Sequence, residues 1–129
     1  MTVLDEVLAR ARAGLRRVAP REVPQLRDAL LVDIRPHHNR VTEGEIPGSI
    51  PVERIVLEWR LDPHGEHRLP GFTADTTVVV LCNEGYASSL AARDLQRIGL
   101  RNATDLDGGF RAYAAEGLPI RAGGTTPVT

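Results

Sequence analysis

Apolar residues gather in short runs that alternate with stretches of helical periodicity. The clearest run, Thr77–Leu81, is β-branched and apolar without alternation, which predicts a central strand buried on both faces. Leu30–Ile34 predicts a second buried strand, and Ala103–Leu106 predicts a third. Weaker patterns predict short strands at Leu15–Val18 and Ser49–Val52. Together these segments predict a mostly parallel sheet of about five strands.

Helical patterns separate the predicted strands. The first helix is expected to begin at Thr2, which can cap it together with Asp5, and to end at Gly14. Further helices are predicted over residues 20–30, 52–59, 88–98 and 110–116, and loops over 35–51 and 62–75. Because strands and helices alternate along the chain, the sequence predicts a single α/β domain.

Composition narrows the chemistry that this chain can perform. Its 129 residues include one cysteine, and all 16 basic residues are arginine. One cysteine excludes an internal disulfide and a multi-thiolate zinc site, and the missing lysine excludes a Schiff base. A net charge of −1 does not favour nucleic-acid binding. No apolar run is long enough to span a membrane, and the acidic N-terminus is unlike a signal peptide, so we expect a cytoplasmic protein.

The single cysteine, Cys82, directly follows the strand predicted at Thr77–Leu81 and precedes a short loop and a helix. At the carboxyl end of a parallel strand, loop N–H groups form an anion-binding nest, and the helix dipole adds partial positive charge. Both favour the thiolate, which is the nucleophile. Gly85 permits the tight loop, and Ser88 and Ser89 can cap the helix and donate toward the sulfur. The position equally fits a small buried hydrophobic residue.

Five short motifs have an order and spacing that resemble a single-domain rhodanese. They are Leu31–Arg35, Glu45–Ser49, Val79–Ser89, Leu106–Phe110 and Gly117–Ile120. The resemblance to this thiosulfate sulfurtransferase-like family implies a three-layer rhodanese domain over residues 15–121, with helices on both faces of the sheet. Residues 1–14 would then form a helical extension, and residues 122–129 a flexible tail.

The resemblance also implies an activity. In this family the loop cysteine attacks the outer sulfur of thiosulfate or a related donor, releases sulfite, and passes the sulfur to cyanide or a thiol. Carried over, Cys82 is the nucleophile and persulfide carrier. The residues that would surround the substrate are Asn83, Glu84, Gly85, Tyr86, Ala87 and Ser88. One cysteine suffices because the acceptor, a small thiol or a protein, comes from outside, and no cofactor or metal is implied.

Two loop residues depart from the family pattern. Ala87 occupies a position where many members have a basic or hydroxyl residue, and Glu84 adds negative charge. Both departures weaken the case for thiosulfate and favour a less anionic donor or a protein persulfide. Two alternatives therefore stay open: a persulfide carrier fed by a protein donor, and a rhodanese-like binding module with little or no catalysis. Related phosphatases have an arginine six residues after the cysteine, which holds the phosphate. This chain has Ser88 at that position, so phosphatase activity is not expected.

Residues outside the loop allow a functional and a structural interpretation. Asp33 and Arg35 end a neighbouring strand, so Arg35 can bind the donor and Asp33 can brace the loop, but a structural ion pair is the favoured alternative. Arg54 and Arg60 can add positive charge, although solvated surface arginines are the simpler interpretation. Glu45 and Tyr113 are expected to be structural differences from the family pattern. Four aromatic residues are expected in the core: Trp59, Phe72, Phe110 and Tyr113. The histidines invite comparison with a zinc site, but His37 and His38 are adjacent and His64 and His67 lie in a polar loop, so no metal site is expected.

Overall fold

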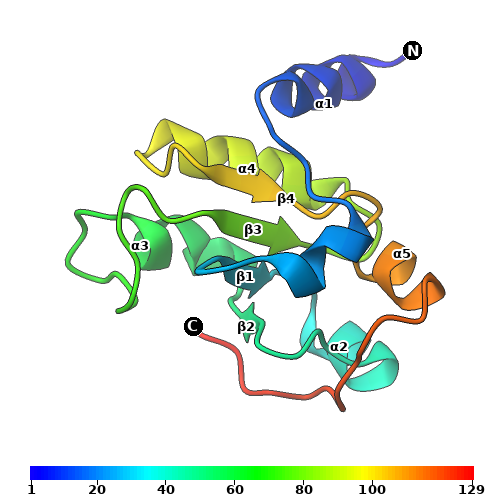
Figure 1. Ribbon diagram of the computed structural model, residues 1–129. Helices are drawn as coiled ribbons and strands as arrows, with labels where there is room; N and C mark the ends of the chain where they lie inside the picture. The colour runs from blue at the N-terminus through cyan, green and yellow to red at the C-terminus, as the bar shows by residue number, and fades with distance from the viewer.

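The strand with the strongest sequence pattern, β3 (Val78–Leu81), lies inside a parallel sheet and is completely buried. A computed structural model describes residues 1–129 (Figure 1). The sheet has the order β2-β1-β3-β4, in which β1 spans Leu30–Asp33, β2 Ile50–Pro51 and β4 Ala103–Asp105. Because every neighbouring pair is parallel, the carboxyl ends of β1 and β3 meet at one edge of the sheet.

Successive side chains of β3 point to opposite faces of the sheet and help to build two separate cores. Val80 and Cys82 belong to the first core, and Val79 and Leu81 to the second. Helices cover both faces, which confirms the predicted three-layer α/β arrangement. They are α3 (Leu57–Leu61), α4 (Ala87–Arg97) and, against α4, α1 (Val3–Ala13) on the first face, and η1 (Pro20–Gln25) and α5 (Gly109–Ala115) on the second. None of these helices has the length and apolar composition to cross a membrane.

The sheet has four strands rather than about five, because the strand predicted at Leu15–Val18 does not form. Only Val18 pairs with the sheet, through one bridge to Leu106 and an N–H donated to the Asp105 carbonyl at 2.9 Å. Two residues later, Pro20 has no N–H and a φ fixed for the 3-10 helix that begins there, so the ladder cannot continue. No backbone hydrogen bond joins the residues just before Val18 to β4.

Two segments differ from the predicted elements because of where their proline and glycine residues lie. A helix, α2 (His37–Glu43), forms within a stretch predicted as mostly loop, because Pro36 directly precedes its first turn and Gly44 ends it with a φ of 94°. These residues therefore bracket a helix instead of excluding one. The helix predicted over residues 20–30 is shorter and of the 3-10 type, because Pro24 lies inside it without an N–H to donate.

The prediction that residues 52–59 form one helix with a buried apolar face is wrong in part. The segment divides into a 3-10 turn, η2 (Arg54–Val56), and α3, and this break changes which side chains face the sheet. The two leucines of α3 are completely buried, whereas Ile55 is 78% exposed and Trp59 is 61% exposed. Trp59 is therefore a surface residue. The other aromatic residues expected in the core are confirmed there: Phe72, Phe110 and Tyr113.

The segment predicted as a flexible tail, residues 122–129, lies along the open edge of β2 (Figure 1). The N–H of Val128 donates to the Pro51 carbonyl at 2.9 Å, and the Val128 carbonyl accepts from the N–H of Glu53 at 2.9 Å. The structure thus gives this segment specific backbone partners, which no local sequence pattern indicated.

Glu45 anchors the beginning of this C-terminal segment. Its completely buried carboxylate accepts hydrogen bonds from Arg40 at 2.7 Å, from Arg121 at 3.1 Å and from the Thr125 hydroxyl at 2.6 Å. Burial is the largest influence and raises the pKa of Glu45, but the bonds from Thr125, Arg40 and Arg121 together outweigh it and lower the pKa from 4.5 to about 2.

We expect Glu45 to contribute to a loss of stability in acid. Because its pKa is lower in the folded protein, its stabilising contribution is complete above pH 4.5 and is lost as the pH falls through about 2. Glu45→Gln removes this titration, so the unfolding free energy of the variant should fall less steeply over the same pH range. Urea denaturation at a series of pH values measures this, and identical slopes for the two proteins would contradict the assignment.

Candidate active site

The candidate site is built where β3 ends. Cys82 is the next residue and is 8% exposed. Its Sγ accepts hydrogen bonds from the backbone N–H of Gly85 at 3.2 Å and of Ser88 at 3.4 Å. Since α4 begins at Ala87, the sulfur also faces the N-terminal end of an eleven-residue helix, where free N–H groups and the helix dipole favour negative charge. The sulfur is thus surrounded by groups that can stabilise negative charge.

The first turn of α5 binds the loop carbonyls on the side away from the sulfur. The N–H of Phe110 donates to the Cys82 carbonyl at 2.9 Å, and the N–H of Arg111 donates to the Asn83 carbonyl at 3.1 Å. This close approach requires a glycine at position 109, because a Cβ on Gly109 would lie 2.6 Å from the Asn83 carbonyl. Because these loop carbonyls already have hydrogen-bond partners in α5, the N–H groups of the loop stay available to an anion on the sulfur side.

Two arginines from the N-terminal part of the chain bind a third loop carbonyl. Arg12 Nη2 donates to the Gly85 carbonyl at 2.7 Å, and Arg17 Nη2 donates to it at 3.0 Å. In a trans peptide the carbonyl and the next N–H point in opposite directions, so this contact leaves the Tyr86 N–H pointing away from the two guanidinium groups. Arg12 and Arg17 lie 73 and 68 residues from Gly85 in the chain, and no sequence motif links them to the loop.

Asp105, at the end of β4, connects these parts beneath the loop. Its completely buried carboxylate accepts hydrogen bonds from Arg17 at 2.9 Å and from the hydroxyls of Ser88 at 2.8 Å and Ser89 at 2.7 Å. Burial, the largest influence on Arg17, lowers its pKa, but the hydrogen bond and charge of Asp105 reverse this and raise the pKa. The expectation that the two hydroxyls point to the sulfur is therefore wrong, because a buried carboxylate needs these donors.

We expect Gly85→Ala to distort the loop of residues 83–88 that surrounds Cys82 Sγ, which we call the cradle. Gly85 has a φ of 86°, and a Cβ there would lie 2.9 Å from the backbone nitrogen of Gly108. The strained backbone alone should lower the unfolding free energy by about 1–2 kcal/mol. The displaced N–H should slow alkylation of Cys82 by iodoacetamide, since Sγ loses the hydrogen bond that the Gly85 N–H donates to it.

Gly48→Ala is the matched control for this prediction. Gly48 has nearly the same φ, 85°, but no atom lies within 4 Å of its added Cβ. It should therefore lose stability to a similar extent while Cys82 is alkylated at the wild-type rate. Equal alkylation rates in both variants would show that Gly85 does not shape the sulfur environment.

Cys82 opens into a pocket of about 330 Å³. Most of the predicted loop residues line this pocket, whereas Gly85 and Ser88 contribute through their N–H groups. Tyr86 is 60% exposed at the opening, with the Arg12 guanidinium 5.4 Å from the centre of its ring. The complete lining is Ile34, Arg35, Pro36, Arg54, Cys82, Asn83, Glu84, Tyr86 and Ala87.

Asp33 and Arg35 form a completely buried ion pair at 2.8 Å beside the pocket. Arg35 also donates to the Gly44 carbonyl at 2.7 Å, and its guanidinium lies 3.8 Å from the centre of the Phe110 ring. These contacts describe a structural brace between β1, α2 and α5. Arg35 nevertheless lines the Cys82 pocket, and its Nη1 is buried without a hydrogen-bond partner. A donor-binding role for Arg35 therefore stays a prediction.

The charged residues around the opening are paired with each other. Arg54 lines the pocket but contacts Glu58 at 2.8 Å and Asp94 at 3.0 Å. Glu84 contacts Arg111 at 3.2 Å, so its negative charge is partly compensated. Arg60 does not line the pocket, and its guanidinium donates to backbone carbonyls near the C-terminus and in the 62–75 loop. Of the two arginines considered from the sequence, only Arg54 lies at the site.

Comparisons with known proteins assign the family. The family model described as "Rhodanese-like domain" matches residues 19–116. A sulfurtransferase from Allochromatium vinosum is 35% identical over 95 residues, which cover 74% of this chain and 80% of that protein. The chain therefore belongs to the rhodanese-like family, as its motifs predicted, and its relatives include sulfurtransferases.

Two other similar proteins have different descriptions. The adenylyltransferase and sulfurtransferase UBA4 of Vanderwaltozyma polyspora is 32% identical over 70% of this chain, and the chain spans only 21% of that larger protein. A solved structure from Rhodopseudomonas palustris, a protein of unknown function described as a possible tyrosine phosphatase, superimposes with a TM-score of 0.83 at 31% identity. The superposition covers 92% of this chain and 93% of that one.

Proposed function

We propose that this protein is a sulfurtransferase that carries sulfane sulfur as a persulfide on Cys82. The observation that supports this most directly is the pair of backbone N–H groups, from Gly85 and Ser88, that donate to Sγ at the opening of a pocket. Such donors stabilise the thiolate that attacks and the negatively charged persulfide that results. The sulfurtransferase relative from Allochromatium vinosum supports the same chemistry.

The proposed reaction has two displacements. The Cys82 thiolate attacks the outer sulfur of thiosulfate, a new S–S bond forms, and the S–S bond of thiosulfate breaks so that sulfite leaves with the electron pair. Cyanide or a thiolate then attacks the outer sulfur of the persulfide, and Cys82 leaves as a thiolate. Charge and atoms balance in both steps, and no oxidant, reductant, metal or second cysteine is required.

The charges at the pocket favour a donor less anionic than thiosulfate, or a protein persulfide. The loop contains no arginine, and Arg54 and Arg35 are already paired with carboxylates. Ala87 is exposed at the opening and offers no donor group. A carrier fed by a protein is therefore the second candidate, and the similarity to part of UBA4 is consistent with it.

Phosphate transfer has less support from the site. A loop that holds phosphate needs a guanidinium to bind it in two places, and the position six residues after Cys82 is Ser88. The Ser88 hydroxyl donates to Asp105 instead of facing the pocket. A phosphatase role, as suggested for the Rhodopseudomonas palustris protein, therefore lacks the group that would bind its substrate here.

Intact mass spectrometry tests the proposal. The protein is incubated with thiosulfate, with a small organic persulfide, or with a persulfide-loaded protein, and a mass gain of one sulfur is expected that is absent in Cys82→Ser. Gain with either small donor supports the sulfurtransferase, and gain only with the protein donor supports the carrier. No gain with any donor would overturn both proposals and leave a binding module.

We expect Ala87→Arg to improve the use of thiosulfate. The side chain would extend from an exposed position at the pocket opening and place a positive charge near an anionic donor. For an exposed charge pair the KM for thiosulfate should fall by up to about fivefold. Ala87→Met, which adds bulk without charge, is the matched control and should not lower the KM. An equal effect of both variants would mean that charge at this position does not limit donor binding.

A further inference from the structure

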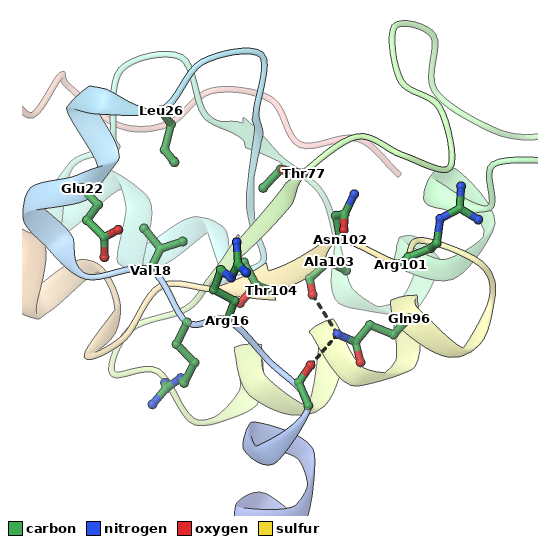
Figure 2. Close-up of a pocket in the computed structure, with 12 residues that line it drawn as sticks. Arg16, Val18, Glu22, Leu26, Thr77, Gln96, Arg101, Asn102, Ala103 and Thr104 are labelled. Atoms are coloured by element: carbon green, nitrogen blue, oxygen red, sulfur yellow. Dashed lines mark hydrogen bonds between the residues drawn. The ribbon is translucent and has the colours of Figure 1, made fainter.

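A second cavity lies on the side of β4 that faces the segment before Val18. It has a volume of about 430 Å³ and shares no lining residue with the Cys82 pocket. The chain pairs with the sheet only at Val18, and the residues just before it form no backbone hydrogen bonds to β4, which leaves space for the cavity between them. Figure 2 shows its lining: Gly14, Arg16, Arg17, Val18, Glu22, Leu26, Thr77, Gln96, Arg101, Asn102, Ala103 and Thr104.

Thr104 lines this cavity and has a polar group without a partner. The residue is 4% exposed, and its hydroxyl oxygen forms no hydrogen bond. An unpaired buried hydroxyl costs about 1–3 kcal/mol, so such groups are rare unless a ligand or water completes them. Gln96 of α4, which also lines the cavity, provides no partner, because it uses its amide N–H groups on the carbonyls of Gly14 and Ala103 (Figure 2).

Arg16 supplies a free positive charge to the same cavity. Arg16 and Thr104 both line the cavity and are labelled among its lining residues in Figure 2. Arg16 takes part in none of the ion pairs of the protein, in contrast to Arg17, which binds Asp105 and Asp107, and Arg101, which binds Asp75. A guanidinium without a carboxylate partner is suited to an oxyanion, which it binds through two parallel N–H groups.

The remaining walls indicate the kind of molecule that fits. Val18, Leu26 and Ala103 are apolar and can cover a small hydrophobic body. Glu22 is the one acidic residue in the lining, and its carboxylate accepts the N–H of Ala19 at 2.8 Å. The volume lies within the range of small-molecule sites, which is about 300–1,000 Å³.

We propose that this cavity binds a small organic oxyanion, a carboxylate or a phosphate ester, whose anionic group pairs with Arg16 and accepts the Thr104 hydroxyl while its apolar part lies on Val18 and Leu26. The site is separate from Cys82 and does not depend on the sulfurtransferase proposal. Neither the family nor the described relatives assign a ligand to this position.

Titration of the full chain by ¹H–¹⁵N NMR tests the proposal, with benzoate, phenyl phosphate, inorganic phosphate and phenol as probes. We expect saturable shifts at the amides of Val18, Thr77 and Thr104 with benzoate or phenyl phosphate, and weaker binding of inorganic phosphate and phenol, which each lack one half of the ligand. Whichever of the two aromatic anions binds more tightly identifies the anionic group.

Variants separate this site from general charge attraction. Arg16→Ala should weaken binding at least about tenfold, since it removes the charged partner. The matched control is Arg27→Ala, an exposed arginine that contacts only the backbone carbonyls of Gln25 and Leu26, and it should bind as wild type does. Thr104→Val should weaken binding without lowering the unfolding free energy, because its hydroxyl has no partner to lose.

Three results would overturn the proposal. They are shifts that do not saturate, equal affinity in wild type and Arg16→Ala, and shifts confined to the loop after Cys82. Because Arg16 is exposed, Arg16→Ala should fold normally, so the comparison remains valid even if Thr104→Val does not fold.

Discussion

Cys82→Ser should abolish sulfur transfer, with a rate at least about a thousandfold below wild type for every donor. A serine hydroxyl is not ionised at neutral pH and cannot form a persulfide, and the chain has no second cysteine to replace it. The fold should be unaffected, because serine is close to cysteine in size and the two N–H groups of Gly85 and Ser88 can donate to its oxygen as they do to Sγ.

Steady-state thiocyanate formation from thiosulfate and cyanide, or sulfide release with a thiol acceptor, measures this effect. Near-UV circular dichroism and the unfolding free energy of Cys82→Ser show whether the fold is retained. A folded Cys82→Ser protein with more than a few per cent of wild-type activity would exclude a persulfide on this residue as the obligatory intermediate.

Asp105→Ala should cause the largest loss of stability of any single change near the site, about 3–5 kcal/mol. The variant leaves the Arg17 guanidinium and the hydroxyls of Ser88 and Ser89 without their common acceptor in the protein interior. Arg17 also binds the Gly85 carbonyl, so its displacement should loosen the cradle as well as the fold. We therefore expect slower persulfide formation in the fraction that remains folded.

Glu116→Ala is a suitable control for Asp105→Ala, because Glu116 forms an exposed ion pair with Arg21 at 3.1 Å. Removing an exposed pair should change the unfolding free energy by less than about 1 kcal/mol. Urea denaturation gives both values, and single-turnover persulfide formation at low temperature reports on the loop. Comparable stability of the two variants would mean that the buried network contributes little to the fold.

The strands and the nucleophile could be predicted from local patterns. The observed bounds of β1, β3 and β4 lie within one residue of the predicted segments. A buried parallel strand is a continuous run of apolar residues, and such a run can be recognised from the sequence alone. The position of Cys82 after β3 followed from the same pattern. The prediction that Trp59 lies in the core failed. The direction of its side chain depends on the break between η2 and α3, which the spacing of apolar residues did not indicate.

The support of the loop could not be predicted, because it comes from distant residues. Arg12, Arg17 and Asp105 each lie outside the motif that contains Cys82, and nothing in their local sequence distinguishes them from surface charges. Their burial follows only from packing of the N-terminal segment and β4 against the loop. The same packing turned the hydroxyl of Ser88 away from the sulfur.

The sequence by itself determined a parallel α/β sheet, a single cysteine at the end of its central strand, and a loop without lysine or arginine, because these depend on residue type and on short-range order. Only the tertiary structure decided which arginines hold the loop, that the ion pair of Arg35 with Asp33 is completely buried, and that Arg16 and Thr104 share a cavity. The physical reason is that hydrogen bonds and ion pairs require proximity in space, and a sequence pattern does not record the distance between residues far apart in the chain.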